Sequence, residues 1–224
     1  MSSIKILPFS FHNGHENMQI DENILEEAIN SQSLAPTFRL YGWKPACVSL
    51  GRNQKDDFLN KELLKSKNID VVTRLTGGRA LLHDKEITYS FVCPQEFLQN
   101  GASVVASYKE ISEFLIKAFE KLDIRLTLGG ESVHTKHDYC MLVSTGADLN
   151  YQGKKLVGSA QCRKKGYILQ HGSILFDYNK ELLETIFNEP VDENLITTIK
   201  QIKDVSIEEF CNEFQTAVFS VLNK

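Results

Sequence analysis

The sequence predicts an α+β (mixed α/β) fold, and three observations lead to this class. Segments rich in strand-forming residues and amphipathic helical segments alternate irregularly along the 224 residues. Hydrophobic residues make up 42% of the chain and charged residues 24%, which is typical of globular proteins. No repeat, low-complexity tract or Gly/Ser-rich linker divides the sequence, so we expect a single domain over residues 1–224 without a separate accessory domain.

Local patterns predict the elements of the first half of the chain. Residues 21–32 predict a helix, because their acidic first turn suits the positive end of a helix dipole. Residues 37–51 predict two short strands around a turn at Lys44-Pro45. We then expect a helix at 56–67 and strands at 69–74 and 87–92. Residues 107–122 form the clearest helix, because apolar residues recur there at steps of three and four.

The second half of the chain predicts strands followed by a terminal helix. We expect strands at 140–149, 155–161 and 167–176, with a turn at 150–153 between the first two. Ser206 and Glu209 have the spacing of a capping box, which predicts the start of a last helix.

Charge and cysteine content exclude several classes of protein. The chain has 25 Lys and Arg residues and 29 Asp and Glu residues, which gives a net charge of −4. This balance indicates no basic surface for binding nucleic acid. No stretch approaches the ~20 apolar residues of a membrane-spanning helix. The five cysteines form no CxxC pair, which argues against a disulfide framework or a structural zinc site. We therefore expect a reduced cytoplasmic protein with no metal.

Three segments carry candidate functional residues, and each also has a purely structural interpretation. In RLTGGRALLHD, the pair Gly77-Gly78 lets backbone amides approach a ligand, and Arg74 and Arg79 provide donors for phosphate or carboxylate. The alternative is a tight turn with solvated arginines. In GKKLVGSAQ, Lys155 precedes the small residues 158–160, or it is an exposed lysine on a hairpin.

The histidines allow similar pairs of interpretations. His171 in LQHGSIL is either a site residue or a packing histidine with satisfied hydrogen bonds. His134 and His137, with Asp138, could form a metal site, and their three-residue spacing would suit a helix. The neighbouring Gly129, Gly130 and Thr135 favour a loop instead, so we expect no metal there.

Together, RLTGGRALLHDKEITYS, GKKLVGSAQ and LQHGSILFD occur in an order that resembles the biotin/lipoate protein ligase and lipoyl-transferase superfamily. The resemblance runs from about residue 17 to residue 177. It implies a mixed, largely antiparallel sheet flanked by helices, with the site on one sheet face. The superfamily includes ATP-dependent lipoate ligases and octanoyltransferases that use a cysteine and no nucleotide.

Three details resemble the octanoyltransferase branch. Arg79 stands where ligases usually have a third glycine, and Glu86-Ile87-Thr88-Tyr89-Ser90 replaces an Asn-rich stretch. Cys140 lies fifteen residues before Lys155, the relation expected between the nucleophile and the lysine of these transferases. The 47 residues that follow Asp177 are too few for an ordinary accessory domain.

The resemblance therefore implies octanoyl transfer from acyl carrier protein, through a thioester on Cys140, to a lysine of a lipoyl-domain protein. Lys155 would favour the thiolate and assist at the acyl carbonyl. The substrate would contact the following residues: Arg74, Gly77, Gly78, Arg79, His83, Gly158, Ser159 and His171. Leu81, Leu82, Val157 and Ile168 are candidate walls of an apolar slot. Four basic residues could steer acidic carriers: Lys154, Arg163, Lys164 and Lys165.

Several alternatives remain open from the sequence. Cys162 is a rival nucleophile, and the other cysteines are interpreted as structural. The transferase would need no cofactor, whereas a lipoate–protein ligase would need ATP and Mg. An amidotransferase that moves the acyl group between lipoyl domains is a third activity. From a different class, the chain could be a non-catalytic binder of acylated carriers.

Overall fold

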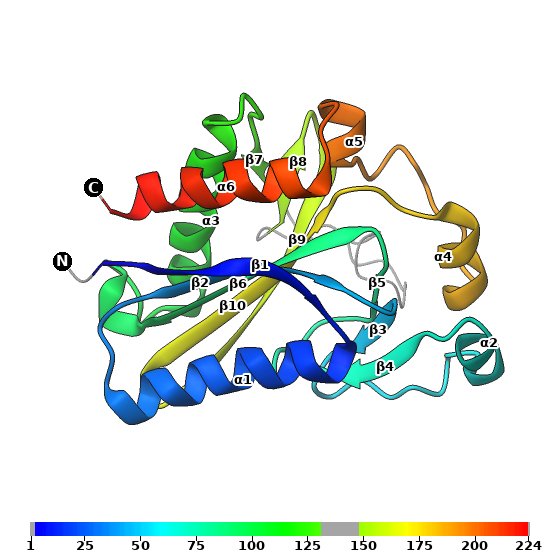
Figure 1. Ribbon diagram of the computed structural model, residues 1–224, viewed down its shortest axis with the longest axis horizontal. Helices are drawn as coiled ribbons and strands as arrows, with labels where there is room; N and C mark the ends of the chain where they lie inside the picture. Colours follow the sequence, from blue (N-terminus) through cyan, green and yellow to red (C-terminus); the bar gives the residue numbers. More distant parts are fainter. Residues whose placement is uncertain (1–2, 131–147, 224) are drawn as a thin grey trace.

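The computed structural model describes residues 3–130 and 148–223 of the chain. Its centre is a seven-stranded sheet with the order β1-β2-β6-β10-β9-β8-β7 (Figure 1). The strand β1 is parallel to β2, and every other neighbouring pair is antiparallel. The predicted mixed, largely antiparallel sheet is thus confirmed. The strands are β1 Lys5–His12, β2 Thr37–Trp43, β6 Glu86–Pro94, β7 Thr127–Leu128, β8 Leu149–Tyr151, β9 Lys154–Lys164 and β10 Tyr167–Leu175.

A second, small sheet lies beside one end of the large one. It has the order β4-β3-β5, with β3 Cys47–Leu50 parallel to β4 Asp70–Thr73 and antiparallel to β5 Leu81–His83. The turn at Lys44-Pro45 separates β2 from β3, as the sequence predicts. The chain between β4 and β5 of this small sheet carries the glycine pair Gly77-Gly78.

Helices cover both faces of the large sheet (Figure 1). The helix α1 Gly14–Ser31 packs on one face, and α3 Val104–Glu120 and α6 Ile207–Leu222 pack against each other on the opposite face. Shorter helices are α2 Lys61–Ser66, η1 Gln95–Phe97, α4 Lys180–Phe187 and α5 Ile199–Ile202. The two helical faces therefore divide the molecule into an α1 side and an α3/α6 side.

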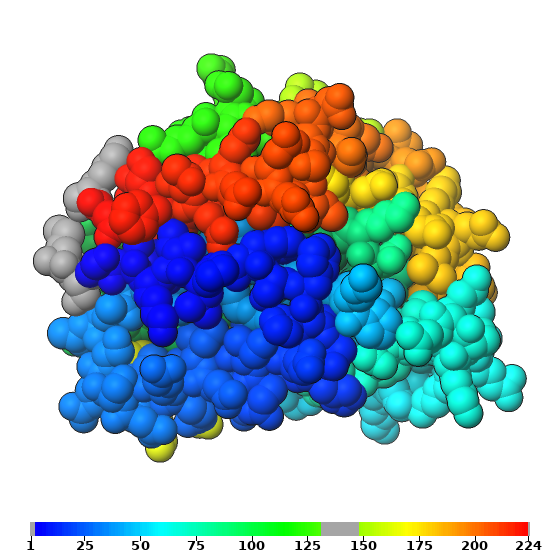
Figure 2. Space-filling model, in the orientation of Figure 1, coloured from blue at the N-terminus to red at the C-terminus, as the bar shows by residue number. Residues whose placement is uncertain are grey.

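The side chains of each strand alternate between these two sides. Phe38, Tyr89 and Phe91 are fully buried on the α3/α6 side, where Phe38 and Phe91 contact rings of α6 and α3. On the α1 side, Val92 and Leu169 pack with Leu25 of α1. Figure 2 shows the C-terminal helix α6, in red, lying along the N-terminal strand β1, in blue. The two elements are joined by a hydrogen bond from the Gln215 side chain of α6 to the Leu7 carbonyl of β1.

Three helices begin at different positions from those predicted, and one of them, α3, begins at Val104, three residues before the predicted 107. The predicted start at 21 is wrong, because α1 begins at Gly14 with a capping box between Asn13 and Glu16. Asp21 lies inside the helix and is buried, so it does not serve the helix dipole. The predicted helix 56–67 is shorter, because the Asn60 side chain caps α2 at the Leu63 amide. In α6, the capping box of Ser206 and Glu209 is confirmed.

Several elements were not predicted, and one prediction lies partly outside the described residues. The strands β1, β5 and β7 and the helices α4 and α5 have short or weak patterns. Of the predicted strand 140–149, only 148 and 149 are described, and Leu149 begins β8. The predicted turn after β8 is confirmed, because Gln152 and Gly153 both have positive φ between β8 and β9.

Candidate active site

A narrow cavity of about 60 Å³ lies on the α1 side, where α1, the large sheet and the small sheet meet. Its wall is apolar and aromatic at Met18, Trp43 and Leu81. The chain between β4 and β5, which carries Gly77 and Gly78, is called the glycine loop below. The remaining lining comes from six strands and this loop: Tyr41, Ser49, Arg74, Gly78, His83, Thr88, Gly158, Ser159, Ala160, His171, Gly172 and Ser173. Gly78 is exposed, which places it where the cavity opens.

A hydrogen-bonded chain of three side chains forms one wall. His83 Nδ1 lies 2.8 Å from a carboxylate oxygen of Glu86, and His83 Nε2 lies 2.8 Å from Ser49 Oγ. Burial lowers the pKa of His83, although the neighbouring Glu86 opposes this shift. A neutral His83 therefore donates a hydrogen bond from Nδ1–H to the Glu86 carboxylate and accepts a hydrogen bond at Nε2 from the Ser49 hydroxyl. The Trp43 ring stacks on the imidazole at 3.9 Å between ring centroids.

A second buried network connects α1 to the floor of the cavity. One carboxylate oxygen of Asp21 pairs with Arg39 at 3.0 Å, and the other accepts from Tyr41 Oη at 2.8 Å and faces His171 Nδ1 at 3.3 Å. Burial raises the pKa of Asp21, but the hydrogen bond and charge of His171 and the charge of Arg39 outweigh burial and lower it. His171 Nε2 lies 2.7 Å from Thr76 Oγ1, so Asp21 orients a histidine that reaches the glycine loop.

Arg74 holds the glycine loop in place. Its guanidinium donates to the carbonyls of Gly77 and Arg79 at 3.0 and 2.7 Å, and to the Ser49 hydroxyl at 2.9 Å. Gly78 has φ +99°, a left-handed conformation that favours glycine. On the facing segment, a Cβ at Gly51 would lie 2.0 Å from the Gly78 carbonyl oxygen. The close approach of these two backbones thus requires glycine at 51.

Lys155 is buried at the start of β9 and forms an ion pair with Asp148 at 3.0 Å, with 3% exposure for each side chain. The backbone around Lys155 is held by hydrogen bonds with Leu195 and Thr197. Cys140, the predicted nucleophile, lies outside the described residues, as do His134, His137 and Asp138.

The structure brings six of the predicted substrate-binding residues to the cavity: Arg74, Gly78, His83, Gly158, Ser159 and His171. Gly77 and Arg79 are held through their carbonyls by Arg74 and are not among the lining residues. Lys155 is not among them either. The expectation that Arg74 offers its donors to a ligand meets a physical obstacle, because its guanidinium already donates to four protein oxygens, on Ser49, Gly77 and Arg79.

Leu81 lines the cavity, but three of the four predicted wall residues do not: Leu82, Val157 and Ile168. The prediction was wrong for Ile168 because strand alternation turns it to the α3/α6 side. Met18, Tyr41 and Trp43 provide apolar wall instead. Ser49, Glu86 and Asp21 were also missed, since nothing in their local sequence shows which histidine each one meets.

The remaining cysteines in the described residues make poor nucleophiles. Cys162, the rival candidate, packs beside Leu25 and Leu169, and burial raises the pKa of its thiol.

Three of the four basic residues predicted to steer acidic carriers have local partners. Lys154 donates to the Glu193 carbonyl, Arg163 to the carbonyls of Gly101 and Ala102, and Lys164 pairs with Glu26.

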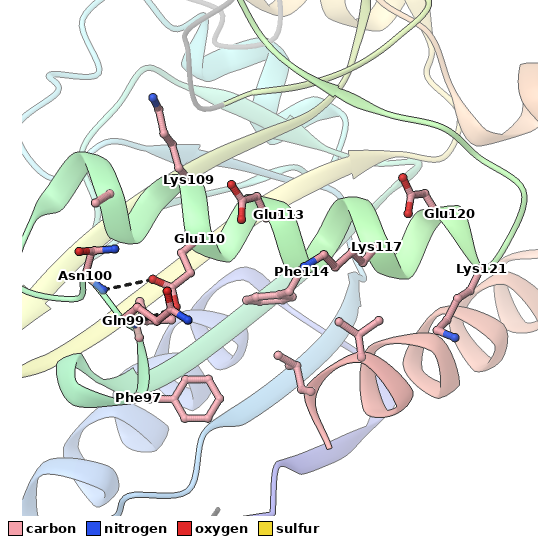
Figure 3. Close-up of a pocket in the computed structure, with 14 residues that line it drawn as sticks. Phe97, Gln99, Asn100, Lys109, Glu110, Glu113, Phe114, Lys117, Glu120 and Lys121 are labelled. Atoms are coloured by element: carbon pink, nitrogen blue, oxygen red, sulfur yellow. Dashed lines mark hydrogen bonds between the residues drawn. The ribbon is translucent and has the colours of Figure 1, made fainter. Parts of the chain in front are cut away.

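A wider groove of about 890 Å³ lies on the α3/α6 side (Figure 3). Lys and Glu side chains of α3 line it together with Phe97 and Phe114. Figure 3 shows Glu110 reaching back to the chain after η1, where it accepts from the Gln99 and Asn100 amides. Its lining includes none of the predicted site residues, so the narrow cavity is the candidate active site.

Two further features concern the described residues only. Within 3–130 and 148–223, no group of three or more His, Cys, Asp and Glu residues is arranged to hold a metal ion. None of the helices in these ranges combines the length and the apolar character needed to span a lipid bilayer.

Comparison with known proteins identifies the family. Residues 13–219 match the lipoyl protein ligase A/B catalytic domain. Octanoyltransferase LipM of Brevibacillus brevis is 37% identical over 206 residues, which cover 86% of this chain and 74% of that protein.

Two solved structures have the same fold. A lipoate-protein ligase A bound with ATP aligns with a TM-score of 0.81 at 20% identity, covering all of this chain and 86% of that one. A bipartite lipoate protein ligase of Thermoplasma acidophilum, studied with its E2 lipoyl domain, aligns with a TM-score of 0.71 at 19% identity, covering 100% and 84%.

Proposed function

This chain belongs to the lipoyl protein ligase A/B catalytic domain family, and on that premise we propose that it transfers an octanoyl group to a lysine of a lipoyl domain. The observation that carries the proposal is the 37% identity with an octanoyltransferase over most of the chain. The cavity supports it, because a narrow slot walled by Met18, Trp43 and Leu81 suits an unbranched acyl chain. Burying each methylene of such a chain contributes about 0.8 kcal/mol.

In the proposed reaction, the Cys140 thiolate attacks the carbonyl carbon of an octanoyl thioester. The new C–S bond forms and the carrier thiolate leaves. In a second step, the amine of the acceptor lysine attacks the enzyme thioester, an amide bond forms, the Cys140 thiolate leaves, and the amine gives up a proton. A covalent intermediate divides a difficult transfer into two easier ones.

Lys155 is proposed to favour the thiolate and to assist at the acyl oxygen. An ammonium near a thiol stabilises its charged form, and a buried, paired lysine is held in one position better than an exposed one. The ion pair with Asp148 at 3.0 Å supports this role because it holds the amine in one buried position at the start of β9.

We propose acyl carrier protein as the donor and a lipoyl-domain protein as the acceptor, in the cytoplasm. In this reaction no nucleotide is consumed. ATP and Mg would be needed only if the acid were activated as an adenylate. The ligase structures share 20% identity or less with this chain and therefore support the fold alone.

The test compares donors. The protein is incubated either with octanoyl-acyl carrier protein or with lipoate and Mg-ATP, and then with a lipoyl domain, and all species are followed by intact mass. We expect an octanoyl adduct on the enzyme and then on the lipoyl domain with the thioester donor, and no adduct with Cys140→Ala. Ser90→Ala and wild type serve as controls.

Other outcomes identify the other activities. Lipoylation from free lipoate and ATP that persists in Cys140→Ala would select a ligase. Acyl transfer only from an already octanoylated lipoyl domain would select an amidotransferase. Tight binding of a lipoyl domain without turnover of any donor would select a non-catalytic binder.

A further inference from the structure

The polar side chains that line the cavity are paired with protein groups, with one exception. Hydrogen bonds engage Ser49 with His83, Thr88 with Glu86, Tyr41 with Asp21, His171 with Thr76 and Ser159 with Tyr89. Ser173 is 1% exposed, and its Oγ has no hydrogen-bond partner among the described residues. A buried hydroxyl without a partner destabilises the folded chain, so one that also lines a cavity is a candidate donor to a ligand.

The direction of the Ser173 side chain follows from its neighbours on β10. A Cβ at Gly172 would meet Tyr89 Cε1 and Ser159 Oγ at 2.6 Å, so position 172 faces the α3/α6 side. Ser173 therefore faces the opposite side, together with His171, which contacts Asp21 of α1. Across the ladder, Ser173 lies opposite Gly158, which has no side chain to cover it. The hydroxyl is thus directed into the cavity that both residues line.

The proposed substrate provides a suitable partner. An octanoyl thioester has one strong hydrogen-bond acceptor, its carbonyl oxygen, and the rest of the acyl group is apolar. We infer that the Ser173 hydroxyl donates a hydrogen bond to this carbonyl oxygen and is a catalytic residue of acyl transfer. This inference rests on the proposed function.

The hydrogen bond gains strength during the reaction. When the thiolate attacks, the C–S bond forms and the carbonyl π electrons move to oxygen, which becomes an oxyanion. Ser173 keeps its proton and donates to this oxyanion until the carrier thiolate leaves and the carbonyl re-forms. Because the bond is stronger in the transition state than in the bound substrate, it accelerates the step rather than only tightening binding.

Ser90 provides a matched control for Ser173. It lies on β6, is 2% exposed, and its Oγ also lacks a partner among the described residues, but it does not line the cavity. We compare Ser173→Ala with Ser90→Ala in single-turnover acylation by octanoyl-acyl carrier protein, followed by intact mass. Loss of one oxyanion donor predicts a rate about 10²-fold lower for Ser173→Ala. Ser90→Ala is expected to react within twofold of wild type.

A stability measurement separates this effect from misfolding. Both alanine variants remove an unpaired buried hydroxyl, so both are expected to unfold at the same urea concentration as wild type or at a higher one. A slow but fully stable Ser173→Ala supports the inference. Ser173→Ala that acylates at the wild-type rate overturns it, because the hydroxyl then lies beside the apolar tail or touches no substrate.

A binding experiment distinguishes failure of this inference from failure of the proposed function. If wild type forms no adduct with any octanoyl donor, the transferase proposal fails. Calorimetry with octanamide and with octyl methyl sulfide, which lacks a carbonyl, then tests Ser173 alone. A preference for octanamide that is present in wild type and Ser90→Ala and absent in Ser173→Ala supports a carbonyl anchor. An equal preference in all three proteins contradicts it.

Discussion

At the residue scale, the site depends on charges and hydrogen bonds that are fully enclosed. Asp21 joins Arg39, Tyr41 and His171, although it is 1% exposed. Removing one partner of a buried ion pair leaves the other charge without compensation, and this costs more than the intact pair contributes. The same reasoning gives different expectations for buried and exposed pairs in this chain.

We expect Asp21→Asn to lower the free energy of unfolding by about 3–5 kcal/mol, because Arg39 remains buried without its carboxylate. The matched control is Asp56→Asn, which removes an exposed pair with Lys61 and should leave stability unchanged within error. Urea denaturation followed by circular dichroism measures both. Equal losses in the two variants would contradict the assignment of Asp21 as a buried charge centre.

His83 gives a prediction about pH. Burial lowers its pKa in the folded protein, so between the ordinary value near ~6.5 and the lowered one the unfolded chain binds more protons than the folded chain. This contribution to stability is complete above pH ~6.5 and is lost as the pH falls through the folded-state pKa.

The measurement is the free energy of unfolding at several pH values between 7 and 5 for wild type, His83→Gln and His15→Gln. We expect the fall in stability toward acid pH to be smaller in His83→Gln than in wild type. His15 is exposed, so its variant should follow the wild-type curve. Parallel curves for wild type and His83→Gln would show that His83 is not the neutral histidine described above.

At the element scale, the position of the glycine loop is set by packing between two backbones. Gly51 follows β3 and touches the loop after β4 where no Cβ fits, whereas a Cβ at Gly77 would meet nothing within 4 Å. The two glycines therefore have different physical roles, although the sequence presents Gly77 as the more prominent one.

We expect Gly51→Ala to destabilise the protein by about 1–3 kcal/mol, because its Cβ would lie 2.0 Å from a backbone oxygen that cannot move freely. Gly77→Ala should change stability by less than about 0.5 kcal/mol. Thermal or urea denaturation tests the pair, and activity should follow the same order because Gly78 lines the cavity. A greater effect at 77 than at 51 would contradict the loop geometry.

At the scale of the whole molecule, the sheet separates a large aromatic cluster from the candidate active site. Phe38, Phe119, Phe210 and Phe214 form a ring cluster on the α3/α6 side. The cavity and its histidines lie on the α1 side. The ring cluster and the candidate active site thus lie on opposite faces of one sheet.

Phe214→Ala is expected to cost about 3–5 kcal/mol of stability, because it empties a fully buried site. The acylation rate per folded molecule should not change, since the substitution does not touch the α1 side. Phe219→Ala, on the same helix but 50% exposed, should leave both quantities close to wild type. Both quantities are measured on the same preparations, by denaturation and by single-turnover acylation. If Phe214→Ala also slowed acylation per folded molecule, the two faces of the sheet would be coupled, which would contradict this prediction.

The sequence by itself determined the elements whose patterns are local. Periodicity located α3, the capping box located α6, and turn residues located the β8–β9 connection, because each depends on residues within a few positions. The motifs also indicated seven of the fifteen residues that line the cavity, including His83, Gly158 and His171. Their roles toward substrate remain predictions.

Only the tertiary structure decided what these residues meet. His171 contacts Asp21 across 150 positions and Thr76 across 95, and no local pattern contains such pairs. Which side of the sheet a strand residue faces depends on register, which explains why Ile168 was misplaced and Trp43 was missed. Ser173 stands out for the same reason, because the tertiary structure alone shows that its hydroxyl lines the cavity and has no partner among the described residues.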